Sequence, residues 1–130
     1  MQKSVTVFCG SSKPKNNDSM LKIINKLSEI IIRNNFRMIY GGAKIGIMGM
    51  LAKKIIEKNG EVIGVIPEVL KKKEIVYSKL TKLHIVKNMH KRKKLMYELG
   101  DLFIVLPGGV GTLEEFFEIL TWKVLGITKK

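Results

Sequence analysis

The sequence has a single cysteine, Cys9, only two histidines and no long apolar run. One thiol cannot form an intrachain disulfide, so a reducing compartment is expected. His84 and His90 lack the spacing of metal ligands, and neither a metal nor another cofactor is predicted. No apolar run approaches the roughly 20 residues that span a bilayer, and the N-terminus lacks the pattern of a signal peptide. A soluble cytoplasmic protein without a membrane partner is therefore expected.

Arginine is also scarce, although the formal net charge is +13. Nearly all of the positive charge is lysine, and the arginines are Arg33, Arg37 and Arg92. Clustered cations gain affinity for nucleic acids by releasing counterions. Here the lysines are spread over every expected helix, which favours a solvated surface, with steering of anionic ligands as the alternative. No nucleic-acid partner is predicted.

Short apolar runs alternate with amphipathic segments along the 130 residues, which suffice for one core. Strands are expected at residues 4–9, 36–40, 61–66, 81–86 and 102–106. Helices are expected after caps at residues 16–18, over 45–57, from a cap at Asn88 to Leu99, and over 112–125. Residues 67–78 are expected to form a loop that can hold a short helix. This alternation predicts a single α/β domain, Rossmann-like, with a parallel sheet covered by helices on both faces.

A glycine-rich loop follows the last expected strand, with Pro107 before it and a helix start at Thr112. Glycines let successive backbone N–H groups turn toward one point, and a helix N-terminus adds free donors and partial positive charge. The loop therefore favours an anion, above all a phosphate. Ligands of parallel sheets bind outside the carboxyl ends of the strands. The small residues at 10–12, 41–43 and 108–112 should line one crevice there.

Arg92 is a charged residue on an otherwise apolar stripe. At ~100° per residue, Arg92 falls among Met89, Leu95, Met96 and Leu99, whereas Lys91, Lys94 and Glu98 face away. A guanidinium directed toward a crevice needs an anionic partner, because burying an unpaired charge is costly. In the alternative interpretation the stem packs and the charged head reaches the rim.

Glu115 has two interpretations. Thr112 and Glu115 have the spacing of a capping box, in which the carboxylate reaches back to the start of the helix. The helix dipole also favours an ionised carboxylate there, which would suit a catalytic base or a stabiliser of a cation. Ile119 and Trp122 share a face with Glu115 and indicate a second buried surface, such as a subunit interface.

Residues 107–115, PGGVGTLEE, match the PGGxGTxxE signature of the Lonely guy family, the cytokinin riboside 5'-monophosphate phosphoribohydrolases. The segments VFCGSS (7–12), YGGAKIGIMG (40–49), GVIP (64–67) and MHKRK (89–93) agree, so the resemblance covers nearly the whole chain. Members often have a third glycine where this chain has Ala43, whose methyl group would narrow or tune the crevice. Relatives also continue beyond the position of Lys130, so a fragment or a short member is expected.

Proteins of this family hydrolyse the N-glycosidic bond of N6-substituted AMP, or of AMP itself, releasing the base and ribose 5-phosphate. The resemblance implies that Arg92 and Glu115 are the catalytic pair and that the protein forms a homodimer or a multiple of dimers. Many relatives carry a lysine decarboxylase label, but nothing in the sequence resembles a pyridoxal phosphate site. Substrate-binding residues are expected at Ser11, Ser12, Gly41, Gly42, Lys93, Gly108, Gly109, Gly111 and Thr112.

Two other functions remain as alternatives. The first is a non-catalytic carrier of a nucleotide or of the molybdenum cofactor, since molybdenum cofactor carriers share the fold and a similar loop. The second is single-stranded DNA binding, which rests on charge alone. Whether the base is plain adenine or a prenylated adenine is open.

Overall fold

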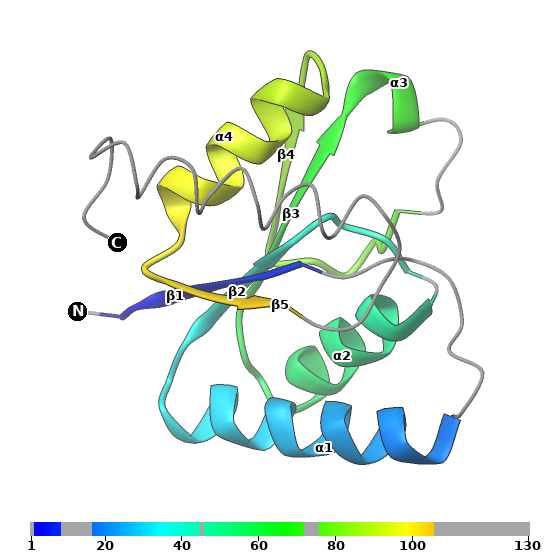
Figure 1. Ribbon diagram of the computed structural model, residues 1–130, viewed down its shortest axis with the longest axis vertical. Coiled ribbons are helices and arrows are strands. Elements are labelled where there is room, and N and C mark those ends of the chain that lie inside the picture. The colour runs from blue at the N-terminus through cyan, green and yellow to red at the C-terminus, as the bar shows by residue number, and fades with distance from the viewer. Residues whose placement is uncertain (1, 9–16, 45, 72–75, 106–130) are drawn as a thin grey trace.

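The computed structural model describes residues 2–8, 17–44, 46–71 and 76–105, with the backbone alone for residues 17–20. Strand bounds agree with the predicted bounds to within one residue. A one-turn helix lies in the segment expected to be a loop that can hold a short helix, and the helix predicted at 112–125 lies outside the described residues. In chain order the elements are β1 (Ser4–Phe8), α1 (Asn17–Arg33), β2 (Arg37–Tyr40), α2 (Gly46–Glu57), β3 (Val62–Pro67), α3 (Glu68–Lys71), β4 (Lys82–Val86), α4 (Met89–Leu99) and β5 (Leu102–Val105) (Figure 1).

The strands form one parallel sheet in the order β4-β3-β2-β1-β5. The chain moves outward from β1 to β4 and then returns to add β5 on the other side of β1. Strand order therefore reverses between β1 and β5, the place at which ligands of such sheets bind. These two strands end side by side, because Phe8 is the register partner of Val105. The predicted parallel α/β fold is confirmed.

Helices cover both faces of the sheet. Helices α1 and α2 pack together on one face, and α4 lies on the other (Figure 1). Side chains alternate between the two faces along each strand. Within the described ranges, no helix is both long enough and apolar enough to cross a bilayer. The larger core, on the α1 and α2 face, is built around the buried residues Val5, Val7, Met38, Tyr40, Val62, Ile24, Ile31, Leu51 and Ile55.

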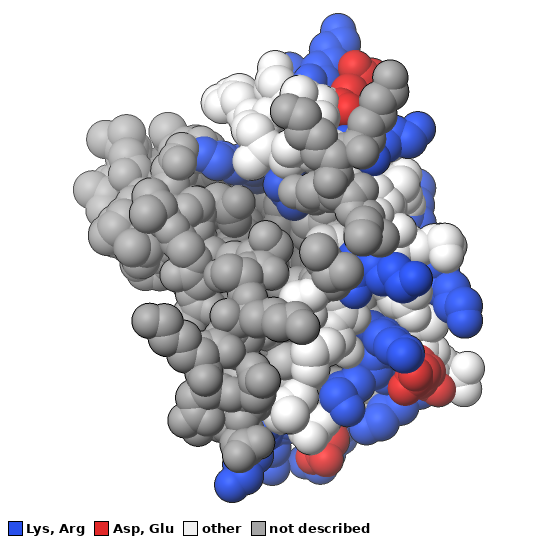
Figure 2. All heavy atoms as spheres, turned by 90° about the vertical axis from the view of Figure 1, so that its right-hand side faces the viewer, with Lys and Arg blue, Asp and Glu red and all other residues white. Residues whose placement is uncertain are grey.

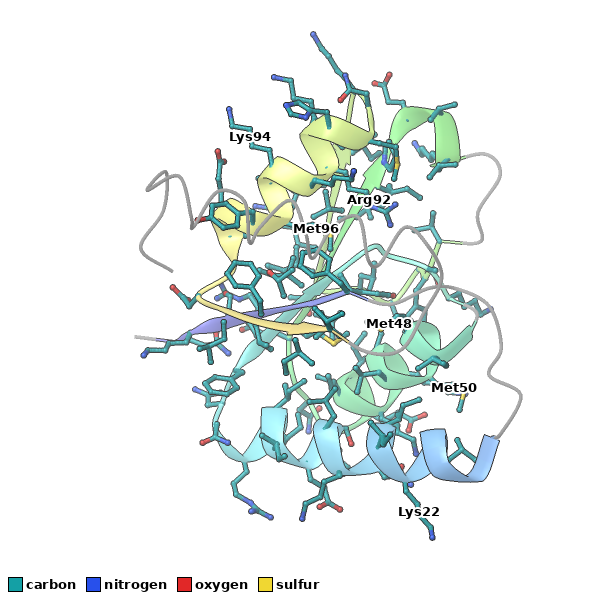
Figure 3. All side chains as sticks on the ribbon, in the orientation of Figure 1. Lys22, Met48, Met50, Arg92, Lys94 and Met96 are labelled. Carbon is teal, nitrogen blue, oxygen red and sulfur yellow. The ribbon has the colours of Figure 1, made fainter. Side chains whose placement is uncertain are left out.

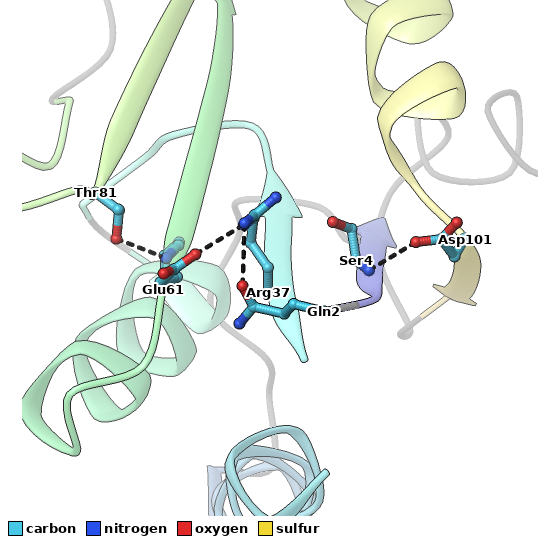
Figure 4. A network of polar contacts seen from close by, with 7 residues as sticks. Gln2, Ser4, Arg37, Glu61, Thr81 and Asp101 are labelled. Atoms are coloured by element: carbon cyan, nitrogen blue, oxygen red, sulfur yellow. Dashed lines mark hydrogen bonds and ion pairs between the residues drawn. The ribbon is translucent and has the colours of Figure 1, made fainter. Parts of the chain in front are cut away.

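Polar side chains join the amino ends of the strands to one another (Figure 4). Arg37 at the start of β2 donates from Nε to Oε2 of Glu61 at 2.8 Å and from Nη2 to Oε1 of Gln2 at 3.0 Å. The backbone N–H of Ser4 donates to Oδ2 of Asp101 at 2.9 Å. This amino edge is therefore closed by partners that come from the chain itself.

Candidate functional site

The carboxyl edge of the sheet contains a tight loop at residues 41–43, directly after β2. Gly42 has a φ of +86°, in the left-handed region that favours glycine. A Cβ at Gly64 of β3 would lie 2.9 Å from Cα of Gly42 and 2.7 Å from Cδ1 of Leu80. The two backbones approach this closely because neither residue has a side chain.

Three consecutive carbonyl groups of this loop accept hydrogen bonds from three different parts of the chain. The Gly41 carbonyl accepts from Nη2 of Arg92 at 3.1 Å. The Gly42 carbonyl accepts from the backbone N–H of Tyr77 at 3.0 Å. The Ala43 carbonyl accepts from the Tyr40 hydroxyl at 2.7 Å. The loop is thus fixed residue by residue.

Tyr40 is almost fully buried, with a relative exposure of 1%. Burial, and then the neighbouring Tyr77, raises the pKa of Tyr40, so the hydroxyl keeps the proton that it donates. Ala43, at the place of the family's third glycine, forms an isolated antiparallel bridge with Val76. The segment at 76–77 therefore lies along the loop and is bonded to it.

Helix α4 carries Arg92 to this edge. Asn88 caps the helix as predicted, and its Oδ1 accepts from the Lys91 N–H at 2.9 Å. Arg92 then lies between α4 and the sheet (Figure 3). Its Nε donates to the Val65 carbonyl of β3 at 3.0 Å, and its Nη2 donates to the Gly41 carbonyl. One guanidinium therefore joins β3 to the loop that follows β2.

The expected anionic partner of Arg92 is a ligand or a residue outside the described ranges, so it stays a prediction. Among the described residues, its oxygen partners are the backbone carbonyls of Gly41 and Val65, which lie just beyond the last register pair of β2 and β3, Tyr40 with Gly64. A carbonyl accepts a hydrogen bond without neutralising the charge. Met89 was expected in the apolar stripe, but it is 39% exposed, and its sulfur lies 3.8 Å from Nη1 of Arg92. Lys91, Lys94 and Glu98 are exposed, as predicted.

The other end of α4 is fixed on β1. Thr6 is fully buried, and its hydroxyl donates to the Met96 carbonyl at 2.8 Å. A Cβ at Gly100, just after the helix, would overlap the Thr6 hydroxyl. Sheet contacts at both ends therefore set the orientation of α4 and the place of Arg92.

The structure describes only part of the predicted site. It brings Gly41, Gly42 and Arg92 together, and Lys93 is half-buried beside Arg92 on α4. Among the described residues, no three His, Cys, Asp or Glu side chains gather as a metal site. The predictions that lie outside the described residues concern Ser11, Ser12, Gly108, Gly109, Gly111, Thr112, Glu115, Ile119 and Trp122.

The charged surface favours anions. Lysine and arginine outnumber acidic residues on the face shown in Figure 2. Beside α2, a groove of about 420 Å³ is lined by Lys44, Lys53 and Lys79 together with Met50 and Tyr77. Sequence reasoning did not identify Tyr40 or Val65 as site residues. An aromatic residue at the end of a strand, directly before two glycines, was the available signal for Tyr40, whereas a carbonyl such as that of Val65 leaves none.

A family model described as "possible lysine decarboxylase" matches residues 48–130, a range that includes Arg92 and Glu115. The chain belongs to this family. The curated relatives are named cytokinin riboside 5'-monophosphate phosphoribohydrolases, which confirms the resemblance to the Lonely guy family. Cytokinin riboside 5'-monophosphate phosphoribohydrolase of Rhodococcoides fascians is 50% identical over 129 residues, covering 98% of this chain and 65% of that protein. Cytokinin riboside 5'-monophosphate phosphoribohydrolase LOG4 of Arabidopsis thaliana is 40% identical over 134 residues, covering 100% and 62%.

Solved structures of this family's fold are also similar. The molybdenum cofactor carrier protein from Chlamydomonas reinhardtii has a TM-score of 0.77 at 20% identity, covering 95% of this chain and 73% of that chain. The molybdenum cofactor binding protein from Rippkaea orientalis has a TM-score of 0.76 at 20% identity, with coverage of 95% and 73%. At this identity the likeness concerns the fold. The chain spans slightly less than two thirds of the length of the two phosphoribohydrolases from Rhodococcoides fascians and Arabidopsis thaliana.

Proposed function

We propose that the protein hydrolyses the N-glycosidic bond of adenosine 5'-monophosphate or an N6-substituted form of it, releasing the free base and ribose 5-phosphate. The names of its relatives support this activity. The observation that carries it is Arg92, a permanent cation held at the carboxyl edge of a parallel sheet by two backbone carbonyls. A cation in that position suits a phosphorylated substrate.

Arg92 keeps both its charge and part of its hydrogen-bonding capacity. A guanidinium has five N–H groups. Two donate to the carbonyls of Val65 and Gly41, and one lies near the Met89 sulfur. Within the described part of the chain, this leaves one N–H on each terminal nitrogen that can donate to a phosphate or a carboxylate. Arg92 thus binds the ribose phosphate or orients Glu115.

The proposed chemistry assigns the second role to Glu115. Cleavage at the anomeric carbon develops positive charge on the ribose, so a nearby carboxylate stabilises it and orients or deprotonates the attacking water. The phosphate, held by the loop that contains Gly108, Gly109, Gly111 and Thr112, fixes the ribose against that carboxylate. Water supplies the hydroxyl group of ribose 5-phosphate, and the departing base takes up a proton.

The remaining predictions belong to the same proposal. Ser11, Ser12, Gly42 and Lys93 are proposed to contact the substrate, and Gly41 is proposed to belong to the same pocket. Positive surface charge supports the approach of a dianionic nucleotide. We further propose a cytoplasmic protein that assembles as a homodimer or a multiple of dimers, with the face of Ile119 and Trp122 at the subunit interface.

Chromatography for free base tests the proposal. Purified protein is incubated with AMP and, separately, with isopentenyl-AMP, and Glu115→Gln is the matched control because it preserves side-chain volume. We expect base release by the unmutated protein alone, while nucleotide binding by Glu115→Gln persists. The preferred nucleotide identifies the base that the pocket accepts.

Two results would contradict the proposal, one concerning the activity and the other the role of Glu115. Thermal stabilisation by AMP without base release from either nucleotide would indicate a carrier and refute the hydrolase. Undiminished turnover by Glu115→Gln would remove this carboxylate from the mechanism while leaving the activity in place.

A further inference from the structure

We infer that Gly41 and Tyr40 are positioning residues for Arg92, and that the loop at 41–43 holds the guanidinium in place. The inference rests on the proposed function in one respect, that Arg92 takes part in the reaction. It differs from the simpler view that the glycines after β2 only leave room for substrate. It assigns to Gly41 a partner within the chain.

The absence of a side chain at position 41 is explained by Arg92 and not by the backbone. Among the described glycines, positive φ values occur at Gly42 and Gly46, so Gly41 has a conformation that alanine adopts without strain. A Cβ at Gly41 would, however, overlap Nη2 of Arg92 and lie 3.1 Å from its Cζ. The overlapping atoms are the end of a flexible side chain. Gly41→Ala should therefore fold and displace the guanidinium.

Tyr40 fixes the same loop from inside the core. Its hydroxyl holds the Ala43 carbonyl, two residues beyond the carbonyl that accepts from Arg92. Tyr40→Phe removes this bond while keeping the ring in the core. Tyr77 provides a matched control, because it holds the loop through its backbone N–H, which Tyr77→Phe retains. Its hydroxyl makes no hydrogen bond among the described residues.

The scarcity of arginine makes the position of Arg92 directly measurable. The chain has three arginines, so a ¹⁵N spectrum of the Nε–H groups contains three signals, and Arg92→Lys assigns one of them. Arg37 is an internal reference, since its Nε–H donates to Glu61 at the opposite edge. Hydrogen exchange of the Arg92 Nε–H should be slow in the unmutated protein because the group donates to Val65.

We expect Gly41→Ala to accelerate exchange of the Arg92 Nε–H by about tenfold or more, the effect of losing one hydrogen bond. Tyr40→Phe should accelerate it less, and Tyr77→Phe should not change it. The Arg37 signal should stay constant throughout. An unchanged Arg92 signal in Gly41→Ala would overturn the inference, whether or not the protein releases base.

Kinetics supply the second measurement. Gly41→Ala should lower kcat by about tenfold or more with a smaller change in KM, because the protein folds but the cation is misplaced. In the Arg92→Lys background, the same change should have little further effect, since both substitutions act on one guanidinium. Effects that multiply independently would indicate that Gly41 contacts substrate directly, and would overturn the inference.

Discussion

At the amino edge of the sheet, Arg37 donates to the carboxylate of Glu61 at 2.8 Å, whereas at the carboxyl edge Arg92 donates to the carbonyls of Val65 and Gly41 at 3.0 and 3.1 Å. Both arginines join neighbouring strands. Among the described residues, the first has a carboxylate partner, whereas the second has two carbonyl oxygens and a thioether sulfur. The difference separates a structural arginine from one that is available to a ligand.

Solvent exposure sharpens the comparison. The Arg37 and Glu61 side chains are 35% and 44% exposed, and ion pairs of this kind contribute about 1 kcal/mol or less. Their loss is therefore easily tolerated. No carboxylate among the described residues pairs with Arg92, so an anion that binds there should gain more free energy than one that binds near Arg37. Sequence changes at the carboxyl edge should therefore affect function.

The largest expected effect comes from exchanging the two arginines for methionine, one at a time. Arg92→Met should lower base release by about 100-fold or more, the range found when a preorganised donor is removed from an active site. Arg37→Met should leave turnover unchanged and lower the free energy of unfolding by about 1 kcal/mol or less. Steady-state kinetics and urea denaturation measure the two quantities. Equal losses of turnover in the two variants would contradict the distinction between a structural arginine at the amino edge and a functional one at the carboxyl edge.

A smaller effect is expected from adding a methyl group at each of two glycines. Gly64→Ala should lower the free energy of unfolding by about 1–3 kcal/mol, because the new Cβ meets the backbone of Gly42, which cannot rotate away. Gly60→Ala, near the amino edge, should cost less, since the two atoms nearest to its new Cβ are side-chain methyl carbons of Ile55 and Ile32, with the Ile55 carbonyl oxygen at 3.0 Å. Urea denaturation compares the two variants. A larger loss at Gly60 would contradict this account of the close strand approach.

The smallest effect appears only in alkali. Burial raises the pKa of Tyr40 above its ordinary value of 10.0, so the folded state holds the hydroxyl proton more tightly than the unfolded chain does. Its contribution to stability is fully present below about pH 10 and is lost as the pH rises further. Urea denaturation between pH 8 and pH 11 should therefore show a steeper alkaline loss in the unmutated protein than in Tyr40→Phe. If stability falls equally with pH in both proteins, Tyr40 does not cause the alkaline loss of stability.

Much of this fold follows from side-chain patterns. Short apolar runs located the strands, Asn88 located the start of α4, and helical periodicity placed Arg92 toward the sheet. The return of β5 to the side of β1 was not specified by the pattern, because the crossover rule fixes handedness and not strand order.

The contacts of Arg92 could not be predicted from the sequence, for a physical reason. Its acceptors at Gly41 and Val65 are backbone carbonyls, which every residue has, so no side-chain pattern marks the ones that are used. The bond between Tyr40 and Ala43 depends likewise on loop geometry. The roles of the glycine loop and Glu115 stay predictions, since these residues lie outside the described ranges.

The attachment of α4 at Thr6 and of Arg92 at the loop also affects the entropy of ligand binding. A freely rotating arginine loses about 1.5–2 kcal/mol of side-chain conformational entropy when it is immobilised. Arg92 is immobilised when the chain folds, before any ligand arrives. An anion that binds there orders itself and its water, but not the cation that receives it.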